Sequence, residues 1–209
     1  MPQWNIDQIA DKLSCRLAGT LPGLQAQLGM APAHREELLR EFAPTDGTRE
    51  AAVLVAVTSH SRPAIVLTER RSNLKHHPGQ ISFPGGRREP DEDLQDTALR
   101  EASEEIGLSS HYVQILGALT PLYIPPSRFH VYPFVGVVSH AASLAPSDDE
   151  VSQIILADVD QLCDPATRST EVRTLRDQTV DIPFFDLDGH KIWGATAMML
   201  AELVEALAD

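Results

Sequence analysis

The hydrophobic positions of the chain form short apolar runs that are typical of strands. Continuous apolar runs at 51–57 and 64–67, separated by Ser61-Arg62-Pro63, predict two paired strands in a buried sheet. Further strands are expected at these positions: 113–119, 131–138, 154–156 and 179–185. The last of these runs leads into Asp188-Gly189, a dipeptide that favours a hairpin turn.

Other segments have the spacing of amphipathic helices. Asn5 is placed to cap a first helix near the N-terminus. Asp91 follows a proline and precedes an acidic turn, so we expect it to cap a central helix that Gly107 ends. A final helix is expected at 196–207, with one apolar face that comprises Met199, Leu200, Leu203 and Leu207.

The order of these elements indicates the fold class. Strands come first, with one helix in the middle and one at the end, which is typical of an α+β domain or an α/β/α layered domain. A length of 209 residues suits a single domain with terminal additions. We therefore expect an N-terminal helical extension over 1–48 and a main domain over 49–209.

Composition and charge limit the possible partners. Hydrophobic residues make up 43% of the chain, which argues against a disordered protein. The formal net charge is −13, and a field of that sign repels nucleic-acid backbones, so binding to nucleic acid is not expected. A phosphate substrate would be repelled too, unless a metal ion or a local basic patch reverses the sign at the site.

The chain has features of a cytoplasmic protein. Cys15 and Cys163 are its only cysteines, and two such distant thiols are expected to be reduced and mostly buried. The N-terminal apolar pattern is interrupted by Asp7, Asp11 and Lys12, unlike a signal peptide. No apolar run approaches the roughly 20 residues that span a bilayer, so no membrane association is expected.

The central helix carries three glutamates on one face. At about 100° per residue, Glu104 and Glu105 lie within about 60° of Glu101, on either side of it. Like charges at this spacing repel one another and weaken a helix. The arrangement is either a solvated acidic surface or a site for a cation, and Mg²⁺ and Mn²⁺ prefer such oxygen ligands.

The segment that contains these glutamates resembles the Nudix box, G-x5-E-x7-R-E-U-x-E-E-x-G-U. The matching positions are Gly86, Glu92, Arg100, Glu101, Glu104, Glu105, Gly107 and Leu108, with Ala102 at a position where a bulkier aliphatic residue is more usual. The resemblance implies an α/β/α sandwich with a loop-helix-loop metal site that hydrolyses nucleoside diphosphates linked to another group. In that pattern Glu92, Arg100 and Gly107 are structural, and the first two form an ion pair.

The same resemblance implies roles for the acidic positions. Glu101 and Glu105 would be the main ligands of Mg²⁺ or Mn²⁺, and Glu104 would be a third ligand or the general base. Gly86 would offer its backbone carbonyl. The metal would neutralise the diphosphate and activate a water molecule, and a carboxylate would accept the proton of that water.

The stretch before the box is similar to the signature of the coenzyme A diphosphatase branch, roughly L-T-x-R-S-x-x-L-R-x-H-x-G-Q-[VI]-[SA]-F-P-G-G. Agreement occurs at Leu67, Thr68, Arg70, Leu74, His77, Gly79, Gln80, Phe83, Pro84, Gly85 and Gly86. The chain departs at Arg71, where Ser is usual, and at Lys75, where Arg is usual. Lys75 keeps the charge but loses bidentate recognition of phosphate.

This second resemblance implies the substrate. Its substrate-binding positions would be Arg70, Lys75, His77, Gly79 and Gln80. The implied reaction is hydrolysis of coenzyme A or acyl-coenzyme A to phosphopantetheine, or its acyl form, and adenosine 3′,5′-bisphosphate. Alternatives are another nucleotide diphosphate, such as ADP-ribose or a nucleoside triphosphate, and a nucleotide-sensing module that does not cut.

Three points stay open in the sequence. His77 either donates to a phosphate or hydrogen-bonds the Gly85-Gly86 loop. Glu150 is either a late metal ligand or base, or part of a solvated loop. The terminal helices either serve a homodimer or cover the sheet of their own chain.

Overall fold

The computed structural model describes residues 4–32, 47–59, 62–74, 78–140, 142–175 and 178–208. Its helices within these ranges are α1 (Ile6–Leu17), α2 (Gly23–Leu28), α4 (Leu94–Ile106), α5 (Val159–Cys163) and α6 (Gly194–Leu207). Its strands are β1 (Arg49–Ser59), β2 (Pro63–Arg70), β3 (Ile81–Ser82), β4 (Gly85–Arg87), β5 (Val113–Ala118), β6 (Leu122–Ile124), β7 (Phe129–Val138), β8 (Val151–Asp158), β9 (Arg168–Leu175), β10 (Gln178–Leu187) and β11 (His190–Trp193). None of the described helices is both long enough and apolar enough to cross a membrane.

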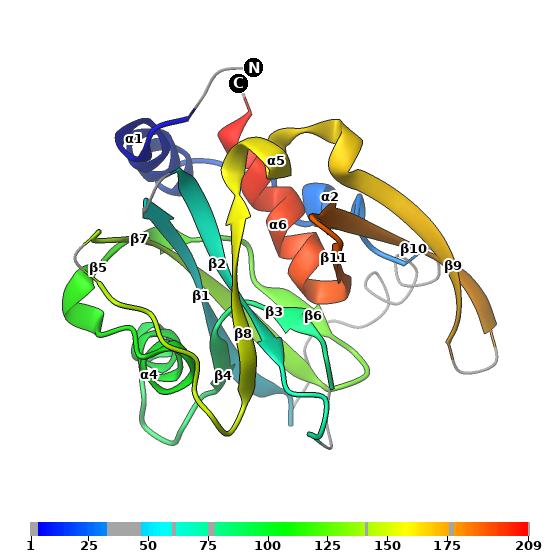
Figure 1. Ribbon diagram of the computed structural model, residues 1–209, viewed down its shortest axis with the longest axis horizontal. Coiled ribbons are helices and arrows are strands. Elements are labelled where there is room, and N and C mark those ends of the chain that lie inside the picture. Colours follow the sequence, from blue (N-terminus) through cyan, green and yellow to red (C-terminus); the bar gives the residue numbers. More distant parts are fainter. Residues whose placement is uncertain are drawn as a thin grey trace.

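The central feature is a mixed sheet built around β1 (Figure 1). β1 runs parallel to β7 over almost its whole length, from Arg49↔Phe129 to Thr58↔Val138. Its other edge pairs antiparallel with β4 at one end and with β2 at the other end. The predicted pairing of the first two strands is therefore confirmed, although it involves only the last residues of β1.

Alternate residues of β1 divide the core into two layers. Ala52, Leu54 and Ala56 are fully buried in a cluster that includes the apolar side of α4. Val55 and Val57 point to the opposite face, where they share a cluster with residues of α1 and α6. Because a strand has a side-chain period of two, this alternation places helices on both faces of one sheet. The predicted α/β/α class is confirmed (Figure 1).

The C-terminal helix α6 is buried on nearly all sides, and Glu205 is its exposed position. The predicted apolar face is buried as expected, but Met198, Ala201 and Val204 on other sides are at most 8% exposed as well. The reason is a second sheet of order β11-β10-β9, which lies over the helix together with α2. The predicted turn at Asp188-Gly189 joins β10 to β11, with both residues at positive φ.

Two local predictions were incomplete or wrong. The central helix is capped by Asp93, not Asp91, because Asp91 adopts a left-handed turn conformation with φ 61°. The strand patterns also missed β6 and β9. Strand β9 carries an exposed, largely polar sequence that pairs with β10 along its length, so its own periodicity does not show it.

Candidate active site

Helix α4 presents the predicted acidic residues beside the short strand β4. Ala98, Ala102 and Ile106 are fully buried against the sheet, which fixes the rotation of the helix about its axis. The helix ends at Gly107, which takes the left-handed conformation (φ 66°) that favours glycine. The backbone N–H groups of Gly107 and Leu108 donate to the carbonyls of Ser103 and Ala102. The acidic face is therefore held at a fixed position and angle.

Glu105 is the most buried carboxylate of this group, with 5% of its surface exposed. Its Oε2 accepts a hydrogen bond of 3.3 Å from the backbone N–H of Gly85, and Nη1 of Arg70 lies 3.8 Å from its Oε1. Burial raises the pKa of Glu105 to about 7, and the negative charge of Glu101 adds to this shift. The site thus holds a carboxylate whose charge is only partly compensated by the protein.

The carboxylate of Glu101 lies directly against the backbone of Gly86. A Cβ atom at position 86 would come within 2.5 Å of the Glu101 carboxylate carbon, so any larger residue there would displace this carboxylate. Burial raises the pKa of Glu101, although Nη1 of Arg100 at 3.0 Å opposes the shift. Glu101 and Glu105 therefore approach β4 at two consecutive glycines, Gly86 and Gly85, which have no side chain.

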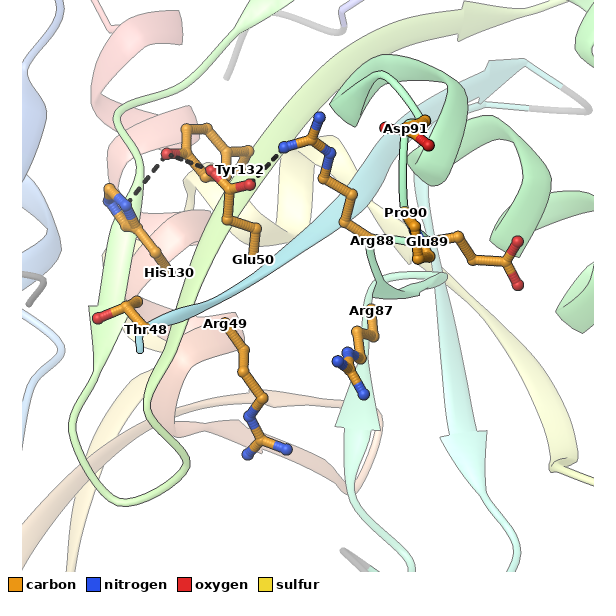
Figure 2. Close-up of a pocket in the computed structure, with 10 residues that line it drawn as sticks. All are labelled: Thr48, Arg49, Glu50, Arg87, Arg88, Glu89, Pro90, Asp91, His130 and Tyr132. Carbon is orange, nitrogen blue, oxygen red and sulfur yellow. Dashed lines mark hydrogen bonds and ion pairs between the residues drawn. The ribbon is translucent and has the colours of Figure 1, made fainter. Parts of the chain in front are cut away.

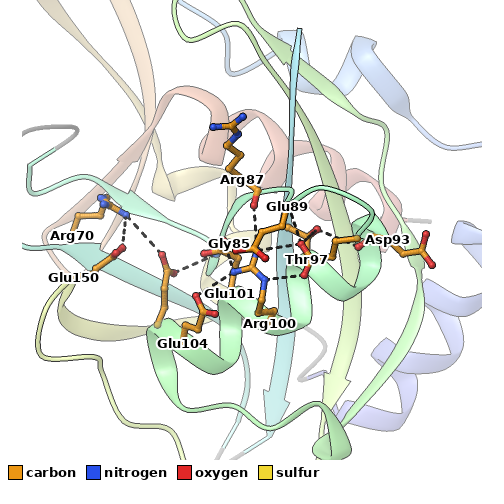
Figure 3. Close-up of polar contacts among 12 residues, drawn as sticks. Arg70, Gly85, Arg87, Glu89, Asp93, Thr97, Arg100, Glu101, Glu104 and Glu150 are labelled. Carbon is orange, nitrogen blue, oxygen red and sulfur yellow. Dashed lines mark hydrogen bonds and ion pairs between the residues drawn. The ribbon is translucent and has the colours of Figure 1, made fainter. Parts of the chain in front are cut away.

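Arg100 connects the start of the box to its helix. Its Nε donates to Glu92 Oε1 at 2.8 Å, and its Nη2 donates to the carbonyl of Arg87 at 3.2 Å. Glu92 also accepts from the Thr97 hydroxyl at 2.7 Å and from the backbone N–H of Glu89 at 3.2 Å. The hydrogen bond from Arg100 holds the pKa of Glu92 at about 2, well below its usual range. This network fastens the turn after β4 to the middle of α4 (Figure 3).

Glu104 differs from the other two acidic residues because its side chain is 60% exposed. Its Oε2 accepts a hydrogen bond of 3.2 Å from Arg100, one turn earlier on the helix. Glu101 also contacts Arg100, so one guanidinium group holds two of the three carboxylates. Glu104 shares the acidic face as predicted but is oriented toward solvent.

The end of β2 contributes Arg70 to the same site. Nη1 of Arg70 lies 3.8 Å from Glu105 and 3.5 Å from Glu150, so it bridges the helix and the segment before β8 (Figure 3). Glu150 is thus brought to the site, with its side chain 52% exposed. Gly79 and Gln80 form backbone hydrogen bonds with Arg70. The N–H of Gly79 donates to the carbonyl of Arg70, and the N–H of Arg70 donates to the carbonyl of Gln80.

The other described arginines near the box have different neighbours from Arg70. Arg71 lies 3.8 Å from Asp148, and Arg88 donates to Glu50 at 2.6 Å. Arg87 is exposed. Two other predicted substrate-binding residues, Lys75 and His77, lie outside the described residues.

The donor set fits a divalent cation that prefers oxygen ligands. The buried carboxylate of Glu105 and the partly buried carboxylate of Glu101 both have raised pKa values, and a cation would relieve both their desolvation and their repulsion. Within the described ranges, no three acidic, histidine or cysteine side chains already converge as a complete ligand set. In this arrangement Glu101 and Glu104 form ion pairs with Arg100.

Sequence reasoning missed a pocket of about 580 Å³ beside the turn that follows β4. Its lining comes from the starts of β1 and β7 and from that turn: Thr48, Arg49, Glu50, Arg87, Arg88, Glu89, Pro90, Asp91, His130 and Tyr132 (Figure 2). Only the parallel pairing of β1 with β7 brings Glu50 opposite His130. No local spacing in the sequence signals this pairing.

Comparisons with known proteins identify the family to which the chain belongs. Residues 48–178 match the family model described as NUDIX domain. A protein of Pectobacterium atrosepticum described as uncharacterized Nudix hydrolase NudL is 34% identical over 175 residues, which cover 83% of this chain and 90% of the relative. A protein of Photorhabdus laumondii with the same description is 33% identical over 162 residues, which cover 77% of this chain and 86% of the relative.

Among solved structures, the MutT protein from Methanosarcina mazei Go1 is 16% identical, with a TM-score of 0.49 over 75% of this chain and 92% of that chain. The family model spans most of the chain, from the start of β1 to the start of β10, and includes the whole acidic helix. This chain belongs to the Nudix family and is a Nudix hydrolase.

Proposed function

We propose that this chain hydrolyses the diphosphate bond of coenzyme A or acyl-coenzyme A, giving phosphopantetheine or its acyl form and adenosine 3′,5′-bisphosphate. The observation that carries the proposal is the position of Glu101 and Glu105 against the Gly85-Gly86 backbone, with Arg70 beside them. This corner combines buried negative charge for a metal with a guanidinium group for a phosphate.

Glu101, Glu104 and Glu105 are the proposed ligands of Mg²⁺ or Mn²⁺, together with the backbone carbonyl of Gly86. When bound, the metal would neutralise charge on the diphosphate and lower the pKa of a coordinated water molecule. Arg100 holds Glu101 and Glu104 at 3.0 and 3.2 Å, so these two side chains are already oriented on the same side of the helix.

Hydrolysis also needs a proton acceptor and a cation that binds the phosphate, and side chains of this site are proposed for both roles. The oxygen of a water molecule forms a bond to one phosphorus, the bridging P–O bond breaks, and the second phosphate leaves with the bridging oxygen. Glu104, the most exposed of the three glutamates, is the proposed acceptor of the proton from the water. Arg70 would bind a non-bridging oxygen of the diphosphate. This contact would replace its 3.5 Å contact with the half-exposed Glu150.

The choice of coenzyme A rests on the resemblance of the segment before the box to the coenzyme A diphosphatase signature. The described part of this segment, residues 67–74 and 78–86, includes the end of β2, β3 and the first residues of β4. Strand β4 packs against the acidic helix, and Arg70 at the end of β2 lies 3.8 Å from Glu105. Its cation Arg70 offsets the overall charge of −13 where an anionic substrate would approach.

A substrate panel tests the proposal. Purified protein is incubated with coenzyme A, acetyl-coenzyme A, ADP-ribose and a nucleoside triphosphate, each with Mg²⁺, with Mn²⁺ and with chelator. We expect metal-dependent release of adenosine 3′,5′-bisphosphate from coenzyme A or its acyl form. Preference for ADP-ribose or the triphosphate would contradict the substrate, and no product from any of the four compounds would contradict hydrolysis itself.

A further inference from the structure

The pocket beside the turn after β4 contains two arginines that no carboxylate neutralises. Nη2 of Arg49 donates to the carbonyl of Ser127 at 2.6 Å, and its guanidinium carbon lies 4.1 Å from the centre of the Phe129 ring. Arg87 is exposed on the pocket wall. Among the described residues, neither Arg49 nor Arg87 forms an ion pair, whereas their neighbour Arg88 is bound to Glu50 at 2.6 Å.

Strand pairing directs these two arginines to the same place. Ala51 is the partner of Arg87 across β1 and β4, so Arg49 is its diagonal neighbour on the same face of the sheet. Diagonal neighbours have side chains about 7–8 Å apart at their bases, within reach of one another for long side chains. In Figure 2 both side chains point to the same side of the pocket, away from Glu89 and Asp91.

Another wall of the pocket is a hydrogen-bonded group of side chains. Glu50 accepts from Arg88 and from the Tyr132 hydroxyl, which lies 3.4 Å away, and that hydroxyl also lies 3.2 Å from Nδ1 of His130. Burial lowers the pKa of His130, which keeps its ring neutral at pH 7. The whole lining holds three arginines and three carboxylates, because Glu89 and Asp91 belong to it as well. The positive charge is therefore local, on the side of the pocket to which Arg49 and Arg87 point (Figure 2).

The pocket is also adjacent to the acidic site. Arg87 directly follows Gly86, against which the Glu101 carboxylate lies, and the carbonyl of Arg87 accepts from Nη2 of Arg100. Gly86 and Arg87 face opposite sides of the sheet, because their partners Ala52 and Ala51 belong to the two different core layers. A ligand with its diphosphate at Glu101 would therefore reach Arg49 and Arg87 by passing the end of β4. Two guanidinium groups around one anion are suited to a phosphate monoester, which offers several oxygens and about two negative charges.

We propose that Arg49 and Arg87 bind a phosphate monoester that the substrate carries apart from its scissile diphosphate. The proposal rests on the proposed function, because the 3′-phosphate of coenzyme A is a group of this kind. The two arginines then determine specificity and take no part in bond cleavage. They select substrates that carry the extra phosphate over substrates that lack it.

The test compares coenzyme A with dephospho-coenzyme A, which lacks only the 3′-phosphate. Because a hydrogen bond between charged groups contributes about 1.5–3 kcal/mol, we expect kcat/KM of the wild-type protein to be about 10–100-fold higher for coenzyme A. Arg49→Met and Arg87→Met should each remove most of this preference, and kcat/KM for dephospho-coenzyme A should change less than about two-fold. Arg62→Met, a surface arginine outside the pocket, is the matched control and should leave both values unchanged.

A binding measurement separates this proposal from the proposed function. By calorimetry, the wild-type protein should bind adenosine 3′,5′-bisphosphate more tightly than AMP, and the two arginine variants should bind both equally. If neither coenzyme A nor its dephospho form is cleaved, the proposed function fails, and calorimetry still decides the role of the arginines. A preference for the 3′-phosphate that persists unchanged in both variants would overturn the assignment of the pocket.

Discussion

Glu101 can place its carboxylate against β4 only because residue 86 has no side chain. A Cβ at Gly86 would meet the Glu101 carboxylate at 2.5–2.6 Å, and Gly86 is not at positive φ, so alanine is compatible with the backbone there. We expect Gly86→Ala to displace Glu101 without unfolding the chain.

The displacement should weaken Mn²⁺ binding and lower kcat about 100-fold, since catalytic groups tolerate little misplacement. Mn²⁺ affinity is measured by electron paramagnetic resonance. The value of kcat is measured with the compound that the substrate panel identifies. The control is Gly19→Ala, where a Cβ has no neighbour closer than 3.7 Å. Normal Mn²⁺ affinity in Gly86→Ala would show that Glu101 is not a ligand.

Removal of the charge of Glu105 should lower activity without lowering the stability of the fold. Glu105→Gln keeps the shape and an oxygen that accepts from the Gly85 N–H, but it loses the charge of a proposed metal ligand. Turnover should fall by about 1,000-fold or more. The metal-free variant should be at least as stable to urea as the wild type at pH 8, because a neutral amide costs less to bury than a carboxylate. Retained turnover would contradict the proposed role of Glu105.

The ion pair between Glu92 and Arg100 should make stability depend on pH. The pKa of Glu92 is lowered from 4.5 to about 2 in the folded state, so its contribution is present above pH 4.5 and is lost as the pH falls toward 2. Glu92→Gln should cost about 1–3 kcal/mol at pH 7 and much less near pH 2.5. Urea titrations of both proteins across this range measure the difference, and a cost that does not decrease with falling pH would exclude the ion pair as its source.

The N-terminal segment should be coupled to the C-terminal helix through Glu202. This fully buried carboxylate accepts from Gln27 Nε2 at 2.7 Å, from the Thr120 hydroxyl at 2.6 Å and from the backbone N–H of Gly23 at 3.1 Å. Glu202→Ala would leave these donors buried without an acceptor, and we expect it to lower the free energy of unfolding by about 3–5 kcal/mol. Glu205→Ala, at an exposed position of the same helix, is the control for helix propensity.

If Glu202→Ala destabilises the protein no more than Glu205→Ala, the segment that contains Gln27 is not held by this carboxylate. Limited proteolysis gives a second measure. Cleavage after the N-terminal helices should be faster in Glu202→Ala than in Glu205→Ala.

The acidic helix shows what local sequence determines. Glu101, Glu104 and Glu105 lie on one face because helix geometry depends only on spacing along the chain, and Gly107 ends the helix because it readily adopts positive φ. The continuous apolar run at 51–57 likewise predicted a strand in a buried sheet, and its residues contribute to both core layers. These features follow from interactions between residues close in sequence, so the sequence alone was sufficient.

Tertiary structure decided the features that depend on pairing between distant segments. Asp91 is of a residue type that favours the N-cap, but it lies in a left-handed turn with φ 61°, and the helix begins at Leu94. The pocket of Arg49 and Arg87 exists because β1 pairs with β7 on one edge and with β4 on the other. Local periodicity gives no information about which strands become neighbours. Strand pairing depends on how the whole core is buried, which involves residues far apart in the sequence.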